Sequence, residues 1–265
     1  MPQEHRPVVL IVGGFATLPI NYWRMRRRLL SRGAERVDIA PVYTPDWLIG
    51  AFLGLGPVMR RTRRAIARTY ELGGRRPIIV IGHSGGGIVA RLAMAHLPFN
   101  GRVAGVADQV GCLVTLGTPH GLATLPNRFQ HAGHSAAAFL DRETPGAYFA
   151  PRTGYLSVGS CFPDAPDPGL GGRLAKQAFS IAVGDDTQAL GDGIVPFSAV
   201  HLDGAEQLTY DDVRHGMIGA PWYGDDAIID RWWPVALRLW NVALEARAHG
   251  DVPEEPLEAE IPVLA

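Results

Sequence analysis

The chain has 265 residues, a length typical of one large domain, with 25 basic against 26 acidic residues and 47% hydrophobic residues. This balance excludes the strongly basic surface of a nucleic-acid-binding protein, and 2 cysteines are too few for a disulfide scaffold. The apolar run Val8–Val12 is shorter than a signal-peptide core, and no stretch approaches the roughly 20 apolar residues of a membrane-spanning helix. We therefore expect a cytoplasmic protein.

Short apolar runs alternate with longer segments of helical periodicity along most of the chain. The expected strands are Val8–Val12, Arg36–Ala40, Pro77–Ile81, Cys112–Leu116, Tyr155–Val158, Phe179–Val183 and Glu206–Tyr210. The expected helices are Asn21–Arg32, Gly56–Leu72, a helix that follows the third strand and ends at His96, and Asp225–Ala248. This alternation predicts an α/β fold with a mostly parallel sheet, because runs that are apolar on both faces suit strands covered by helices on both sides.

The alternation fails between Pro119 and Lys176, where Gly, Pro, Ala and His are frequent. A structureless loop of that length is uncommon inside a compact domain, so we expect an inserted helical cap or lid at about 120–176. The insertion would belong to a single domain at 1–250. The segment 251–265 is acidic and contains prolines, and we expect it to be a flexible tail.

One serine stands among glycines where the third strand should turn into a helix, in Gly82-His83-Ser84-Gly85-Gly86-Gly87. The spacing Gly82-x-Ser84-x-Gly86 fits a nucleophile elbow, a strained turn that exposes the serine hydroxyl at the edge of the sheet. The flanking glycines let the strand and the helix approach each other. Context makes a chance match improbable, because the pattern falls at the end of an apolar strand.

A serine hydroxyl needs a histidine to accept its proton and an acid to orient that histidine. With a nucleophile elbow, the chain order is serine, acid, histidine. Asp192 lies in the turn "GDGIVPFSA" after the Phe179–Val183 strand, with Asp185 and Asp186 as rivals nearer the end of that strand. His215 follows the Glu206–Tyr210 strand, which is the required place for the base. We predict Ser84, Asp192 and His215 as the catalytic residues.

The other histidines are expected to play different roles. His120 and His201 are predicted to be structural or to line a pocket, and the His83 ring should pack beside the sheet. His131 and His134 have a helical i, i+3 spacing, but no cysteine or carboxylate pattern joins them, so we predict no metal site. No cofactor is expected.

Two backbone N–H groups are needed to hold the oxyanion of a tetrahedral intermediate. We predict that one belongs to Gly85, after the nucleophile, and the other to Phe15, in the loop after the first strand. A Gly13-Gly14 pair after a strand also occurs in dinucleotide-binding loops, but "GGFATL" lacks the third glycine of that fingerprint. The elbow itself requires neither Gly85 nor Gly87, so we expect close approach by substrate at Gly85 and by a neighbouring strand or helix at Gly87.

Several segments resemble serine lipases of the α/β-hydrolase superfamily, namely "GHSGGGIVARL", "TLGTPHGL" and "GDGIVP" with a later histidine. The block from Gly191 to Gly224 is similar to a bacterial, cyanobacterial and plant lipase-like group related to GPI inositol-deacylases. The resemblance implies an α/β-hydrolase fold with Ser84 as nucleophile, Asp192 as acid and His215 as base. The chain departs from many such lipases at Gly13-Gly14, where His-Gly is common, and at Gly85, where Met or Ala is frequent.

Two apolar regions are candidates for an acyl-binding site, and packing on the sheet is the alternative for both. They are the segment Pro45–Met59 and the apolar side chains of the insertion, Phe129, Phe139, Leu140, Tyr148 and Phe149. Four arginines share much of one helical face: Arg60, Arg61, Arg64 and Arg68. This face is either solvated or in peripheral contact with anionic lipid headgroups.

These observations favour a serine carboxylic-ester hydrolase, a lipase or esterase that acts on lipid or other acyl esters. An acyltransferase with the same triad is one alternative. A non-catalytic lipid or partner binder that keeps the fold is another, although intact Ser, Asp and His at the three expected places argue against it. The sequence gives no reason to expect nucleic acid as a partner.

Overall fold

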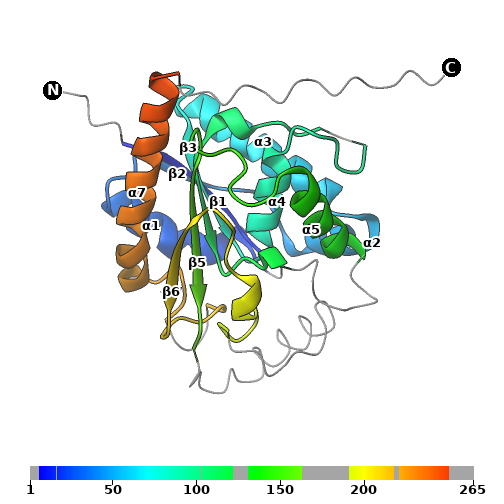
Figure 1. Cartoon of the computed structure of the whole chain (residues 1–265). Helices are drawn as coiled ribbons and strands as arrows, with labels where there is room; N and C mark the ends of the chain where they lie inside the picture. Colours follow the sequence, from blue (N-terminus) through cyan, green and yellow to red (C-terminus); the bar gives the residue numbers. More distant parts are fainter. Residues whose placement is uncertain are drawn as a thin grey trace.

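A sheet of parallel strands forms the centre of the computed structural model, which describes residues 6–15, 17–101, 103–121, 131–162, 191–217 and 221–250. The described strands form one 6-stranded sheet in the order β2-β1-β3-β4-β5-β6. The sheet lies between the helices in Figure 1. Their bounds are β1 Val8–Val12, β2 Arg36–Ile39, β3 Ile78–His83, β4 Val110–Leu116, β5 Gly154–Ser160 and β6 Glu206–Tyr210. The α/β fold class predicted from the sequence is therefore confirmed.

Burial along the strands explains why they form the middle of the molecule. Every residue of β1, β3 and β4 is buried, as expected for strands with helices on both faces. The edge strand β6 instead alternates between exposed and half-buried residues until Tyr210. Both β1 and β6 have the bounds predicted from the sequence, whereas β3 extends two residues further, to His83, next to the serine.

Two helical layers cover the sheet (Figure 1). The described helices are η1 Pro19–Tyr22, α1 Trp23–Ser31, α2 Thr44–Leu53, α3 Gly56–Leu72, α4 Gly85–Met94, η2 Ala107–Gln109, α5 His131–Glu143, η4 Phe197–Ala199 and α7 Asp226–Ala248. Helices α1 and α7 bury Met25, Trp232 and Trp240 against one face. Helices α3, α4 and α5 bury Ile66, Leu140 and their neighbours against the other.

Helix α2 was not predicted. Its segment was expected only to be an apolar region, because Gly50 and Gly54 interrupt the helical pattern. The helix nevertheless begins with Pro45 in its first turn, and the Asp46 carboxylate accepts a hydrogen bond from the Tyr43 N–H at 3.0 Å. Gly50 lies against Val58 of α3, so the missing side chain allows the two helices to approach each other.

The span 120–176, predicted as an inserted cap or lid, contains part of the scaffold. Helix α5 contacts α2 and α4, and β5 pairs with β4 inside the sheet. The remaining parts of this span, 122–130 and 163–176, lie outside the described residues, as do the predicted strand Phe179–Val183 and the tail 251–265. Among the described helices, none is long and apolar enough to cross a bilayer.

Candidate active site

Ser84 lies in the turn between β3 and α4 with a backbone φ of 56° and ψ of −133°. A non-glycine residue rarely adopts a positive φ, so the turn is strained, as a nucleophile elbow requires. A Cβ on Gly82 would lie 2.5 Å from the Gly87 Cα, and a Cβ on Gly86 would collide with the Val12 carbonyl oxygen. Both glycines are therefore required by the close approach of β3, α4 and β1.

Gly85 and Gly87 are also crowded. A Cβ on Gly87 would collide with Thr118 Oγ1 and lie 2.7 Å from its Cγ2, in the segment after β4. Gly87 therefore has a close neighbour, but this neighbour belongs to the segment after β4 and not to a strand or helix as expected. At Gly85, where we expected substrate to approach, the Trp47 ring of α2 fills the space, with its nearest atom 3.0 Å from the Cβ position.

Asp192 and His215 form a buried pair. The His215 Nδ1 lies 2.8 Å from Asp192 Oδ2, and the His215 N–H donates to the Asp192 carbonyl at 3.0 Å. The other carboxylate oxygen, Oδ1, accepts the N–H groups of Ile194 and Val195 at 3.1 and 2.8 Å. The "GDG" turn thus holds the carboxylate close to the backbone, and the ring of His215 presents its second nitrogen, Nε2, for other partners.

A third side chain contacts the same carboxylate. The Tyr223 hydroxyl donates to Asp192 Oδ2 at 2.9 Å. Burial alone would raise the pKa of Asp192, but the charge of His215 and the hydrogen bonds from His215, Val195 and Ile194 together lower it. Burial and the adjacent Asp192 charge raise the pKa of Tyr223 well above its ordinary value, so its hydroxyl keeps its proton. Sequence reasoning missed Tyr223, because an aromatic residue in the block "GAPWYG" carries no local signal for this role.

The elbow and the Asp192–His215 pair lie at the same edge of the sheet. His83, the neighbour of Ser84, has its ring centroid 4.9 Å from that of His215. A Cβ on Gly117 at the end of β4 would lie 2.7 Å from Asp192 Oδ2 and 3.1 Å from His215 Nδ1. The structure therefore places the three predicted catalytic residues around the carboxyl ends of β3 and β4, although the catalytic role of each stays a prediction.

The loop after β1 lies directly against the serine. A Cβ on Gly14 would lie 2.5 Å from Ser84 Cβ and 3.1 Å from Ser84 Oγ. Phe15 follows Gly14, and 44% of its surface is exposed. Gly85 begins α4, where the first N–H groups of a helix have no partner within it. The loop and the helix start are thus both beside Ser84, and the oxyanion role of Phe15 and Gly85 stays a prediction.

A hydrogen-bond chain runs beneath the site through Tyr22 and His83. The Tyr22 hydroxyl accepts the Gly14 N–H at 3.2 Å and lies 2.9 Å from His83 Nδ1. His83 Nε2 lies 3.2 Å from the His215 carbonyl oxygen. Burial and, less strongly, the nearby His215 lower the pKa of His83 to about 3, so the imidazole is neutral. Burial raises the pKa of Tyr22 to about 12 despite the hydrogen bonds from its neighbours.

The remaining predicted polar residues lie elsewhere. His120 is buried, with Nε2 3.1 Å from Thr115 Oγ1, and His201 has Nε2 3.0 Å from Thr209 Oγ1. Both contacts are structural and do not include Ser84, as expected. The rivals to Asp192, Asp185 and Asp186, lie outside the described residues, as do the side chains of His131 and His134.

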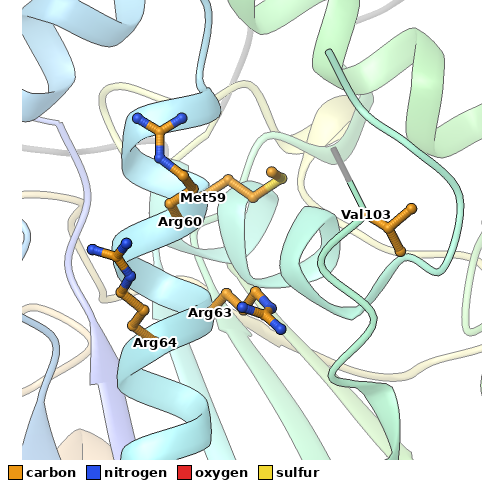
Figure 2. Close-up of a pocket in the computed structure, with 5 residues that line it drawn as sticks. All are labelled: Met59, Arg60, Arg63, Arg64 and Val103. Atoms are coloured by element: carbon orange, nitrogen blue, oxygen red, sulfur yellow. The ribbon is translucent and has the colours of Figure 1, made fainter. Parts of the chain in front are cut away.

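A separate hollow of about 410 Å³ lies beside helix α3 and contains part of the predicted arginine face. Figure 2 shows four side chains that project from successive turns of α3, and Val103 on a separate segment. The residues that line the hollow are Met59, Arg60, Arg63, Arg64 and Val103. Arg61 instead pairs with Asp46 of α2 at 2.9 Å. The lining therefore carries three guanidinium groups and no carboxylate.

The predicted apolar candidates for an acyl site divide into two groups. Phe139 and Leu140 of α5 are buried in the core, and Phe149 packs against it. Phe129 lies outside the described residues. On α2, Trp47 is buried beside Gly85, whereas 48% of Leu48 and 48% of Ile49 is exposed. Trp47 of α2 thus places an apolar ring next to the elbow.

Comparisons with known proteins agree with this architecture. A family model described as "PGAP1-like alpha/beta domain" matches residues 59–141, which include the elbow. A crystal structure of Bacillus licheniformis lipase BlEst2 in mature form is similar at a TM-score of 0.59 and 16% identity, over 91% of this chain and 94% of that chain. Est1E from Butyrivibrio proteoclasticus is similar at a TM-score of 0.48 and 14% identity, over 93% and 90% of the two chains. No curated protein sequence matches the chain.

The match to BlEst2 shows the fold. The chain has the α/β-hydrolase fold, with a mostly parallel sheet and helices on both faces, as its motifs implied. The resemblance drawn from those motifs is confirmed by the family model and by this fold.

Proposed function

We propose that the protein is a serine carboxylic-ester hydrolase, a lipase or esterase. The observation that carries the proposal is the buried pair of His215 and Asp192 at the edge where a strained turn presents Ser84. The Asp192 carboxylate is held by four hydrogen-bond donors, as expected of an acid that keeps a catalytic histidine in one orientation. The α/β-hydrolase fold and the PGAP1-like match to the elbow region support the same class of reaction.

The proposed reaction starts with proton transfer from Ser84 Oγ to His215 Nε2, because Nδ1 is bound to Asp192. The serine oxygen attacks the ester carbonyl, and the resulting oxyanion accepts hydrogen bonds from the Phe15 and Gly85 N–H groups. The carbon–oxygen bond of the leaving alcohol then breaks as His215 returns the proton to that alcohol. Water, deprotonated by His215, attacks the acyl-enzyme and releases the carboxylic acid and free Ser84.

Replacement of the nucleophile is the first test. We expect Ser84→Ala to lower kcat/KM for p-nitrophenyl butyrate by at least about 10³-fold, with an unchanged melting temperature. A fluorophosphonate probe should label the native chain at Ser84 and should not label the variant. Ser198, which lies outside the elbow, supplies the matched serine-to-alanine control and should leave activity unchanged. Full activity in Ser84→Ala would refute the assignment.

Product analysis separates this proposal from the two alternatives. A hydrolase releases the free acid from an ester panel in the presence or absence of an added alcohol, whereas an acyltransferase forms a new ester with it. A non-catalytic binder forms neither product and is not labelled by the probe. A panel of p-nitrophenyl esters of increasing chain length, beside phospholipid and triglyceride emulsions, then defines the acyl preference.

We further propose peripheral contact with an anionic lipid surface through the hollow beside α3. Guanidinium groups bind phosphate well, and the hollow's lining holds Arg60, Arg63 and Arg64 without a carboxylate. Arg60→Gln with Arg64→Gln should reduce co-sedimentation with vesicles of phosphatidylcholine and phosphatidic acid. The matched double variant Arg27→Gln with Arg142→Gln removes two exposed charges on the other helices α1 and α5 and should bind as the native chain does. Equal loss in both double variants would contradict a localised contact.

A further inference from the structure

Two buried side chains connect the three parts of the proposed active site. We infer that Tyr22 and His83 are positioning residues that set the spacing between the loop after β1, which contains Gly14 and Phe15, the nucleophile elbow and the proposed catalytic histidine, His215. The inference rests on the proposed function and deepens it. The chain of contacts runs from the Gly14 N–H to the Tyr22 hydroxyl, from there to His83, and from His83 to the backbone of His215.

The partners fix the direction of every hydrogen bond in this chain. The His215 carbonyl oxygen can only accept, so His83 Nε2 must carry a hydrogen and donate to it at 3.2 Å. A neutral imidazole has one N–H, so Nδ1 is then an acceptor for the Tyr22 O–H at 2.9 Å. The Tyr22 oxygen keeps its lone pairs for the Gly14 N–H at 3.2 Å. Thr17 Oγ1 lies 3.3 Å from the same hydroxyl and donates its own hydrogen to the Gly14 carbonyl at 2.8 Å, so it competes with His83 Nδ1 for the Tyr22 hydrogen. The contact with His83 is the shorter one at 2.9 Å, and with the Tyr22 hydrogen on that side the hydrogen-bond chain has one arrangement of hydrogens.

The protonation states required by this arrangement match the surroundings. Burial lowers the pKa of His83 to about 3, which keeps the ring neutral when the neighbouring His215 takes up a proton. Tyr22 and His83 are 1% and 2% exposed, so water cannot replace the contacts. A buried donor or acceptor that loses its partner carries the full penalty of desolvation, and the chain therefore resists rearrangement.

Each end of the hydrogen-bond chain lies next to a predicted catalytic group. Gly14 precedes Phe15 and lies against Ser84, and His83 precedes Ser84. The carbonyl held by His83 belongs to His215 itself. Because a displacement of about 1 Å at a catalytic group lowers rates by up to about 100-fold, small shifts along this chain should change the chemical step.

The test removes single contacts. Tyr22→Phe removes the hydroxyl that holds Gly14 and donates to His83. His83→Asn keeps an acceptor for Tyr22 and loses the donor to the His215 carbonyl, whereas His83→Gln can keep that donor. We expect Tyr22→Phe and His83→Asn to lower kcat for p-nitrophenyl butyrate by about 10- to 100-fold, with KM changed by less than about threefold. The decrease in kcat should be smaller for His83→Gln.

Tyr155→Phe is the matched control. The Tyr155 hydroxyl is also buried and also accepts one backbone N–H, from Phe149 at 3.3 Å, but it lies at the opposite end of its strand from the site. The variant should keep kcat while losing a comparable amount of stability. If Tyr155→Phe and Tyr22→Phe lower kcat equally, or if Tyr22→Phe leaves kcat unchanged, the positioning role is refuted.

A second readout does not depend on ester hydrolysis. Nitrogen NMR of the Ser84→Ala chain should show a neutral His83 with its hydrogen on Nε2, and Tyr22→Phe should perturb the Nδ1 signal. A hydrogen on Nδ1 would overturn the inference. Full hydrolytic activity in Ser84→Ala would instead overturn the proposed function, while the His83 tautomer still decides for or against the hydrogen-bond chain.

Discussion

Gly87 in the first turn of α4 allows a sharp test of the packing around the elbow. By helix propensity alone, Gly87→Ala should stabilise the chain by about 1 kcal/mol. The structure predicts the reverse, because the new Cβ would collide with the Thr118 Oγ1 and lie 2.7 Å from Cγ2. Thr118 cannot rotate away freely, since its Oγ1 donates to the Ser84 carbonyl at 2.9 Å.

The expected magnitude follows from these opposing effects. Overpacking costs about 1–3 kcal/mol, and loss of the Thr118 hydrogen bond adds about 1 kcal/mol. After subtraction of the propensity gain, Gly87→Ala should reduce the free energy of unfolding by about 1–3 kcal/mol. The shift of Ser84 should also lower kcat. Urea denaturation and p-nitrophenyl butyrate hydrolysis measure the two effects.

A double-mutant cycle isolates the contact. Thr118→Ala removes both colliding atoms, so Gly87→Ala with Thr118→Ala should be more stable than Gly87→Ala alone by about 1 kcal/mol or more. Gly56→Ala is the control, because Gly56 also lies in the first turn of a helix but its Cβ would meet only Arg60 at 3.6 Å. The reasoning is refuted if Gly87→Ala is as stable as the native chain.

Three further outcomes are expected. Tyr223→Phe removes a hydrogen-bond donor from the buried Asp192 carboxylate. Denaturation should show a loss of about 2 kcal/mol in the free energy of unfolding, and kinetics a decrease of about tenfold in kcat. A native kcat would show that Asp192 does not need this donor. Gly85→Ala should lower kcat by pressing on the Trp47 ring, and Trp47→Phe in the same chain should restore part of it; no restoration would argue against that contact. The pKa of His83 is 6.5 in the unfolded state and about 3 in the folded state. Between pH 6.5 and pH 3 only the unfolded state binds a proton at this residue, so the free energy of unfolding should decrease as the pH falls. From pH 6.5 to 5 this loss is about 2 kcal/mol, and His83→Gln, followed by denaturation at each pH, should lack it.

The placement of the three predicted catalytic residues, though not their roles, could be foreseen from local sterics and chain order. The elbow could be predicted because a strained turn between a strand and a helix demands glycines at fixed positions around Ser84. Asp192 and His215 could be paired in advance because both follow late strands, and parallel strands end at one edge of the sheet. The structure adds that their side chains are 2.8 Å apart.

The features that were missed depend on contacts between distant parts of the chain. Tyr22 and His83 are 61 residues apart in sequence, and Tyr223 and Asp192 are 31 apart, so no periodic pattern connects them. Helix α2 was missed for a different reason: Gly50 lowers its helix propensity but is needed where α2 packs on α3. Tertiary packing decided the outcome at each of these positions.

Hydrogen bonds from two tryptophans of α7 bear on when the proposed activity can appear during synthesis of the chain. Trp232 Nε1 donates to the Tyr223 carbonyl at 3.0 Å, and Trp240 Nε1 donates to the Pro77 carbonyl at the start of β3 at 2.8 Å. Helix α7 follows every other described element in the chain, so it leaves the ribosome after them. The start of β3 and the backbone of Tyr223, whose hydroxyl donates to Asp192, gain these hydrogen bonds only when α7 docks. The proposed ester hydrolysis should therefore begin only after α7 has been released and has folded against the sheet.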